Sequence, residues 1–172
     1  MRLFSLRMPR PESRGEFKQF VGSCMKKYCS AVLLSAAVLG VAAEENLALK
    51  KPVTASSVER KTLEPELAVD GNLKTRWASQ FNDPQWFMVD LGRVRKVGRV
   101  VIHWEKAFGK RYKIQLSSDQ KHWKDVLLKE NGIGGKETLT FPQQEARYVR
   151  FAGDSRGSWN GYSFWEFQVF EK

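Results

Sequence analysis

The chain contains few of the residues that form cross-links or carry out catalysis. Its two cysteines, Cys24 and Cys29, both lie near the N-terminus, and its two histidines are His103 and His122. From residue 44 onward the chain therefore has no disulfide and no thiol nucleophile. It also lacks an apolar run of about 20 residues, the length that spans a bilayer. Core burial has to stabilise the domain after residue 43, and its length is sufficient for that.

Sequence motifs of common enzymes are also absent. The chain has no Gly-x-Ser-x-Gly elbow, no phosphate-binding loop and no zinc-ligand spacing. His103 alternates within an expected strand, and His122 follows Asp119 at an expected hairpin tip. A glycosidase needs two carboxylates that face each other across a cleft, and one small domain rarely supplies such a cleft. We therefore expect a protein without enzyme activity.

Composition and charge narrow the class of protein further. Apolar residues make up 42% and charged residues 28% of the chain, which excludes disorder, collagen and a polytopic membrane protein. The 29 Lys and Arg against 19 Asp and Glu give a formal charge of +10. Seven basic and two acidic residues precede residue 44, so residues 44–172 carry 22 basic and 17 acidic side chains, or +5. Half of the excess thus lies outside the main domain, which weakens the indication of a nucleic-acid partner.

Residues 25–43 have the pattern of a secretory signal peptide. A basic start at Met25 leads to an apolar run over residues 31–40 and to a small-residue end at Ala43. We expect cleavage near Ala43 and a secreted or periplasmic protein. A buried core helix or an uncleaved anchor is the alternative for this run. Residues 1–24 show no sustained period, and we interpret them as a disordered leader or an incorrectly assigned start.

Residues 44–172 show short alternating apolar runs separated by turn residues such as Asn131-Gly132. About eight strands of this kind predict an all-β antiparallel sandwich. The clearest runs are residues 87–91, 100–104, 112–116, 123–128, 138–141, 147–152 and 165–170. Only residues 64–69, with Pro65 at the first position, predict a helical turn.

All six tryptophans lie in this domain. Trp104 and Trp165 are in phase with apolar neighbours on their strands, so we expect both in the core. Trp159 is different because it belongs to a Gly-rich polar loop, residues 155–162. A large ring has little reason to lie in such a loop unless something covers it.

A short polar segment carries three oxygen-bearing side chains. Asp70, Asn72 and Thr75 lie close together in the sequence around Gly71. Hard cations such as Ca²⁺ take about six to eight oxygen ligands, many of them backbone carbonyls of such loops. The same residues fit an Asx turn with capping hydrogen bonds, and the residue types alone favour that second interpretation.

Eight segments, in order along the chain, together resemble the discoidin domain, the coagulation factor 5/8 C-terminal type. They are Asn46–Ala48, Lys51–Ser57, Asp70–Asn72, Thr75–Ser79, Asp83–Trp86, Val89–Gly92, Ala146–Arg150 and Gly161–Phe167. Within that family the sequence is most similar to bacterial carbohydrate-binding module family 32. Eukaryotic members usually join their ends by a Cys pair, which is missing here and favours the bacterial branch. The resemblance implies a jelly-roll β-sandwich like the galactose-binding domain.

The resemblance also implies a structural Ca²⁺ ion near the two ends of the domain. The corresponding ligands here are the side chains of Asp70, Thr75 and Glu166 and the carbonyls of Leu67, Asn72, Thr75 and Trp165. A cation would also offset the cost of burying Glu166 among its aromatic neighbours.

In sugar-binding relatives the ligand lies on loops at one end of the sandwich, where a ring stacks on the pyranose and polar groups bind its hydroxyls. The matching positions here are Glu59, Arg76, Gln80, Phe81, and Trp159 or Tyr162. The last loop departs from the common Trp-Gly-Tyr-Ser pattern by the inserted Asn160. Arg76 also fits a partner for a nearby carboxylate, and Glu59 a solvated loop charge.

We therefore predict a monomeric, non-catalytic module that binds oligo- or polysaccharides. The alternative is an adhesion module of the discoidin type that binds membrane phospholipid or protein, with basic residues at 93–96 and 110–111. Solvated strand ends are the stronger explanation for those charges. Export argues against a nucleic-acid partner.

Overall fold

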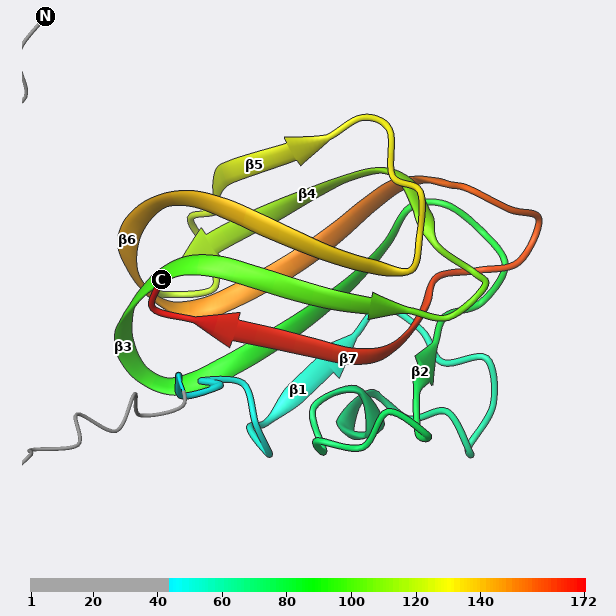
Figure 1. Cartoon of the computed structure of the whole chain (residues 1–172), viewed down its shortest axis with the longest axis horizontal. Coiled ribbons are helices and arrows are strands. Elements are labelled where there is room, and N and C mark those ends of the chain that lie inside the picture. Colours follow the sequence, from blue (N-terminus) through cyan, green and yellow to red (C-terminus); the bar gives the residue numbers. More distant parts are fainter. Residues whose placement is uncertain (1–43) are drawn as a thin grey trace, which may run out of the picture. The chain divides into compact units, whose positions relative to one another are not determined.

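The computed structural model describes residues 44–172, which form an almost entirely β-structured domain (Figure 1). The expected signal peptide and leader, residues 1–43, lie outside the described residues. The elements in chain order are β1 (Val53–Ala55), the 3-10 turn η1 (Pro65–Ala68), β2 (Trp77–Ala78), β3 (Gln85–Trp104), β4 (Gly109–Ser117), β5 (Lys124–Lys129), β6 (Lys136–Arg156) and β7 (Ser163–Phe170). In residues 44–172 no helix is long and apolar enough to cross a membrane.

Two long strands fold one antiparallel sheet into two layers. The seven strands follow the order β2-β7-β3-β6-β4-β5, and β1 pairs with β3. Residues 85–90 of β3 pair with residues 148–153 of β6, whereas residues 99–103 pair with residues 136–140. Figure 1 shows β3 and β6 curling between these two ladders. One layer contains β1, β4 and β5 and the other contains β7 and β2, so the predicted jelly-roll sandwich is confirmed.

Aromatic side chains fill the space between the layers. Trp77, Phe87 and Phe164 are fully buried, and their ring centroids lie 4.9 to 5.3 Å apart at tilted or edge-on angles. Such geometry is the favourable one for aromatic pairs. Trp104 packs on Phe164 at 5.6 Å, which confirms its predicted place in the core.

The prediction that Trp165 lies in the core is wrong. The register between β3 and β7 pairs Glu166 with His103 and Phe164 with Trp104, and so skips Trp165. An extra residue of this kind changes the phase of the strand's alternation. Phe164 and Phe167 are therefore both buried, whereas Trp165 is only half-buried.

The two ends of the described domain lie side by side. The backbone N–H of Leu47 donates to the carbonyl of Val169 at 2.7 Å, and that of Val169 donates to Asn46 Oδ1 at 3.1 Å. Glu44 also pairs with Arg99. Most loops that join the strands gather at the end of the sandwich where β3 and β6 finish, on the right in Figure 1, whereas the loop between β4 and β5 lies at the opposite end.

Candidate functional site

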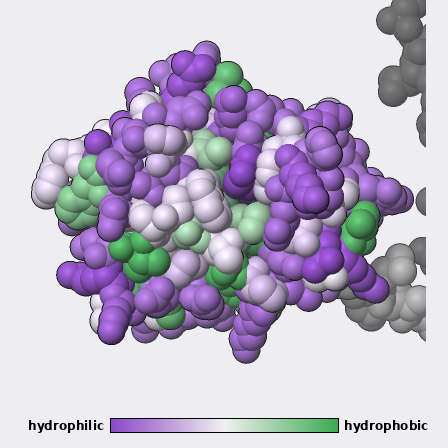
Figure 2. Space-filling model, turned by 180° about the vertical axis from the view of Figure 1, so that it is seen from behind, coloured by the Kyte–Doolittle hydropathy of each residue, from purple (hydrophilic) through white to green (hydrophobic). Residues whose placement is uncertain are grey.

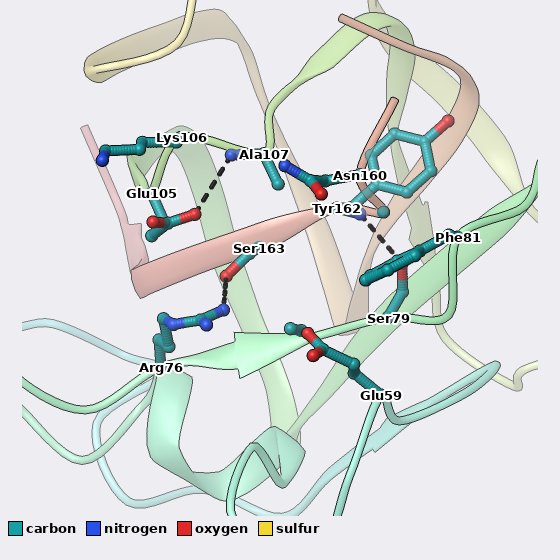
Figure 3. A pocket seen from close by; sticks show the side chains of 12 residues that line it. Glu59, Arg76, Ser79, Phe81, Glu105, Lys106, Ala107, Asn160, Tyr162 and Ser163 are labelled. Carbon is teal, nitrogen blue, oxygen red and sulfur yellow. Dashed lines mark hydrogen bonds between the residues drawn. The ribbon is translucent and has the colours of Figure 1, made fainter. Parts of the chain in front are cut away.

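The connecting loops enclose a cavity of about 200 Å³, here called the loop-end cavity. Its walls come from four segments of the chain: Glu59 follows β1, residues 76–81 surround β2, residues 105–107 join β3 to β4, and residues 160–163 lead into β7. Side chains from these segments converge on the hollow (Figure 3). The strands thus bring together residues that lie about a hundred positions apart in the sequence.

Arg76 is held in the cavity wall by hydrogen bonds to β7. Its Nη1 donates to Ser163 Oγ at 2.6 Å, and Ser163 Oγ donates to the carbonyl of Trp77 at 2.8 Å. Within residues 44–172 Arg76 forms no ion pair, so its interpretation as a carboxylate partner is wrong. A guanidinium has five N–H donors, and the remaining ones are free to bind a ligand at this wall.

Two carboxylates also line the cavity. Glu59 is half-buried, and its closest cation is Arg60, with Nη1 at 3.9 Å from Oε1. It therefore forms part of the wall and is only partly exposed to solvent. Glu105 Oε2 accepts a hydrogen bond from the N–H of Ala107 at 3.2 Å (Figure 3). Both carboxylates keep oxygen atoms that can accept hydrogen bonds from a hydroxyl or ammonium group.

Two exposed aromatic rings lie together at this end of the domain. Phe81 is 48% and Trp159 80% exposed, and their centroids are 6.2 Å apart with the planes nearly perpendicular. The ring of Trp159 thus lies open to solvent in its polar loop. Gln80 is exposed next to Phe81 and shares a shallow hollow with it and Glu59. Figure 2 views the molecule from behind, and its left edge, the loop end, shows pale and green side chains protruding from a purple surface.

Tyr162 is buried, and its ring faces the core. The ring packs on Phe151 at 5.4 Å, and the hydroxyl donates to Asp83 Oδ1 at 2.5 Å. Burial, followed by the hydrogen bond to Asp83, raises the pKa of Tyr162 above its ordinary value. Arg156 binds Asp83 at 3.1 Å and the carbonyl of Trp159 at 3.2 Å, which fixes the loop. Of the two predicted alternatives, Trp159 presents its ring to solvent and Tyr162 supports the loop from inside.

The segment around Asp70 forms a tight turn closed by its own side chains. Asp70 Oδ1 accepts from the N–H of Asn72 at 2.8 Å, and Asp70 Oδ2 accepts from Thr75 Oγ1 at 2.7 Å. Asn72 Oδ1 accepts from the N–H of Lys74 at 3.1 Å. The interpretation as an Asx turn is therefore confirmed.

Glu166 approaches this turn from β7 and is 1% exposed. Its Oε1 accepts from the N–H of Gly71 at 2.8 Å, whereas Oε2 is buried and has no hydrogen-bond partner in the described part of the chain. Burial, and then the nearby Asp70 carboxylate, raise the pKa of Glu166 to about 7. A buried carboxylate oxygen beside a second carboxylate fits a cation that would neutralise both.

Backbone oxygens would have to complete such a cation site. Within residues 44–172 no group of three or more His, Cys, Asp and Glu side chains gathers in one place. Trp165 is the bulged residue that the β3–β7 register skips, and Leu67 belongs to η1 beside the turn. The donor set of carboxylate, hydroxyl and carbonyl oxygens is the chemistry that Ca²⁺ prefers.

Comparison with known proteins identifies the family. Residues 52–167 match the family model of the F5/8 type C domain. The chain belongs to this family. Chitosan-binding module 1 of a chitosanase/glucanase from Paenibacillus sp. IK-5 is 45% identical, with a TM-score of 0.71 over 73% of this chain and 98% of that one. Module 2 of the same enzyme, in complex with chitotriose, is 39% identical, with a TM-score of 0.71 over 73% and 99% of the two chains.

A curated relative is much longer than this F5/8 type C protein. Polysaccharide lyase 8 family protein HylA of Enterococcus faecalis is 34% identical over 133 residues. That match covers 68% of this chain but only 10% of the lyase. Carbohydrate-binding modules of family 32 are also among the similar structures, so the predicted family is confirmed.

The sequence did not predict several residues that line the loop-end cavity of this F5/8 type C domain. They are Ser79, Glu105, Lys106, Asn160 and Ser163. Ser79 and Ser163 belong to segments that carry the family resemblance, and Asn160 is the inserted residue of the last loop, but no motif marks any of the five as a site residue. Only the folded arrangement of the loops brings them to one cavity.

Proposed function

We propose that this F5/8 type C domain binds glycans without catalysis at the loop-end cavity, and that its preferred ligands contain glucosamine. The observation that carries the proposal is the exposed Phe81–Trp159 pair, because Phe81 lines the cavity together with the carboxylates of Glu59 and Glu105. Exposed aromatic rings on a rigid scaffold are suited to cover the apolar face of a pyranose. Arg76, held by Ser163, supplies donors for the sugar hydroxyls.

The preference for amino sugars follows from the two carboxylates that line the cavity beside Arg76 and Lys106. Glu59 and Glu105 have no close cation within hydrogen-bond distance in the described residues, and a glucosamine ammonium group would give each carboxylate a charged donor. The similarity to two chitosan-binding modules, at 45% and 39% identity, supports this choice. Several of the similar structures are binding modules, which also supports a function without catalysis.

We further propose that the domain holds a structural Ca²⁺ ion and is exported after cleavage near Ala43. The side chains of Asp70, Thr75 and Glu166 and the carbonyls of Leu67, Asn72, Thr75 and Trp165 would hold the ion. The bound ion would supply positive charge to two carboxylates that otherwise repel each other. The buried, unpartnered Glu166 Oε2 is the observation that supports it.

One observation favours a second candidate function, adhesion to anionic phospholipid. Ile133 and Trp159, each 80% exposed, both belong to loops at the cavity end, and Lys106 is exposed there as well. Apolar side chains flanked by cations can insert into a membrane interface. Sedimentation with phosphatidylserine vesicles tests this candidate, and an Ile133→Ser variant should then lose most of its binding.

A glycan array with the purified protein tests the proposed function. We expect retention on glucosamine-containing glycans, at least tenfold weaker binding for Trp159→Ala, and no release of reducing ends from any bound glycan. Trp123→Ala is a matched control, because the Trp123 ring is half-buried and does not line the cavity. The guanidinium carbon of Arg150 lies 3.8 Å from the centroid of that ring. Failure of the folded protein to bind any glycan would overturn the proposal.

A further inference from the structure

We propose that a second sugar subsite, floored by Trp165, adjoins the loop-end cavity, so that the domain binds a chain of sugar residues instead of a single one. This inference rests on the proposed function and adds to it the length of the ligand. It gives a role to Trp165, which the sequence predicts in the core and which the fold turns outward.

The two hollows share a wall. The second hollow has a volume of about 300 Å³ and is lined by Trp104, Glu105, Lys106, Gly135 and Trp165. Glu105 and Lys106 also line the loop-end cavity. A ligand in the first hollow that extends past these two residues therefore enters the second.

Trp165 provides an aromatic surface that the core does not use. The bulge in β7 directs Phe164 and Phe167 into the core and leaves Trp165 half-buried. The guanidinium carbon of Arg76 lies 5.9 Å from the centroid of its ring, and Arg76 is itself held by Ser163. One side chain of the loop-end cavity thus orients the floor of the next hollow. A large, fixed aromatic surface of this kind is suited to stack on a pyranose ring.

The shared wall carries polar groups that a ligand can bind. Glu105 Oε2 accepts one backbone hydrogen bond, from Ala107, and neither Glu105 nor Lys106 belongs to an ion pair among residues 44–172. Lys106 is exposed. At the junction the carboxylate can accept hydrogen bonds from hydroxyl or ammonium groups of the ligand, and the Lys106 ammonium group can donate to its hydroxyl oxygens. The ligand class is therefore an oligosaccharide of pyranose residues with free amino and hydroxyl groups.

Titration calorimetry with glucosamine oligomers of increasing length tests the second subsite. For the wild-type protein, the dissociation constant should fall about tenfold between the dimer and the tetramer, because stacking on Trp165 adds to the binding free energy. In Trp165→Ala the ratio of the two constants should approach one. Trp165→Phe should keep part of the ratio, and Trp123→Ala should keep all of it.

Each outcome bears on a distinct claim. The subsite would be overturned if a folded Trp165→Ala protein kept the wild-type ratio of the dimer and tetramer dissociation constants. It would also be overturned if the wild type bound the dimer as tightly as the tetramer. Both results would leave the proposed function intact. Absence of binding to every glucosamine oligomer would overturn the proposed function together with the subsite. If Trp165→Ala does not fold, the Lys106→Ala variant replaces it, because the Lys106 side chain is exposed. Lys106→Ala should lower the ratio of the dimer and tetramer dissociation constants several-fold. An unchanged ratio would contradict the subsite.

Discussion

Removal of the proposed Ca²⁺ ion should make the stability of this domain depend strongly on pH, through Glu166. The pKa of this carboxyl rises from 4.5 to about 7 in the folded protein, first because of burial and then because of Asp70. Since the folded-state pKa is the higher one, the contribution of Glu166 to stability is fully present below about pH 4.5 and is lost as the pH rises through 7.

The size of the effect follows from the two pKa values. One pKa unit corresponds to about 1.4 kcal/mol, so ionising Glu166 in the folded, metal-free protein costs about 3 kcal/mol. For a domain of this length, that loss lowers Tm by roughly 10 °C. A bound Ca²⁺ ion would offset the charge of the ionised carboxylate and remove most of the loss.

Thermal denaturation monitored by circular dichroism, from pH 5 to pH 8, measures this. In EDTA we expect the Tm of the wild type to fall by roughly 10 °C more over that pH range than the Tm of Glu166→Gln, because the variant has no carboxyl group that titrates at this position. Excess CaCl₂ should restore Tm at pH 8 and change it little at pH 5. Identical pH profiles for the wild type and Glu166→Gln in EDTA, or a Tm that CaCl₂ does not change at pH 8, would refute the reasoning.

Two further predictions concern the buried parts of the domain. Glu137→Ala should lower the free energy of unfolding, measured by urea titration, by about 3 kcal/mol or more. Glu137 Oε2 accepts hydrogen bonds from Trp104 Nε1 and the Tyr112 hydroxyl, both at 2.6 Å. In the variant these two buried donors would lose their partner. A loss below about 1 kcal/mol would contradict this. Gly153→Ala should cost about 1–3 kcal/mol, since its Cβ would lie 2.5 Å from ring atoms of Tyr162. An unchanged unfolding midpoint would show that the Tyr162 ring is not fixed there.

The local alternation of apolar residues was sufficient to predict most of the strands. Residues 112–116 lie within β4, residues 165–170 within β7, and the turn expected around Pro65 is η1. The continuity of β3 and β6 was not predictable. The bend of β3 near Gly92, at φ 81°, is followed by a mostly exposed run, residues 93–96, with three basic side chains. Such a run resembles a strand end, although the same strand continues in the other layer.

The candidate site was predictable only where a family motif marks it. Glu59, Arg76 and Phe81 line the cavity as the resemblance implies. The orientation of Tyr162 and Trp165 depends on a bulge and on a core partner, which the residue types do not encode. Trp159, which the sequence distinguishes from the other tryptophans by its polar loop, is exposed because no strand neighbour covers it.

A nuclear magnetic resonance titration of the ¹⁵N-labelled protein with a glucosamine tetramer tests most directly whether the loop-end cavity binds glycans. We predict that the largest amide shifts occur at the loops of Glu59, Phe81 and Asn160 and at the Trp159 indole, with little change at residues 93–96. The absence of shifts at saturating tetramer, or shifts concentrated away from these loops, would contradict the proposed site.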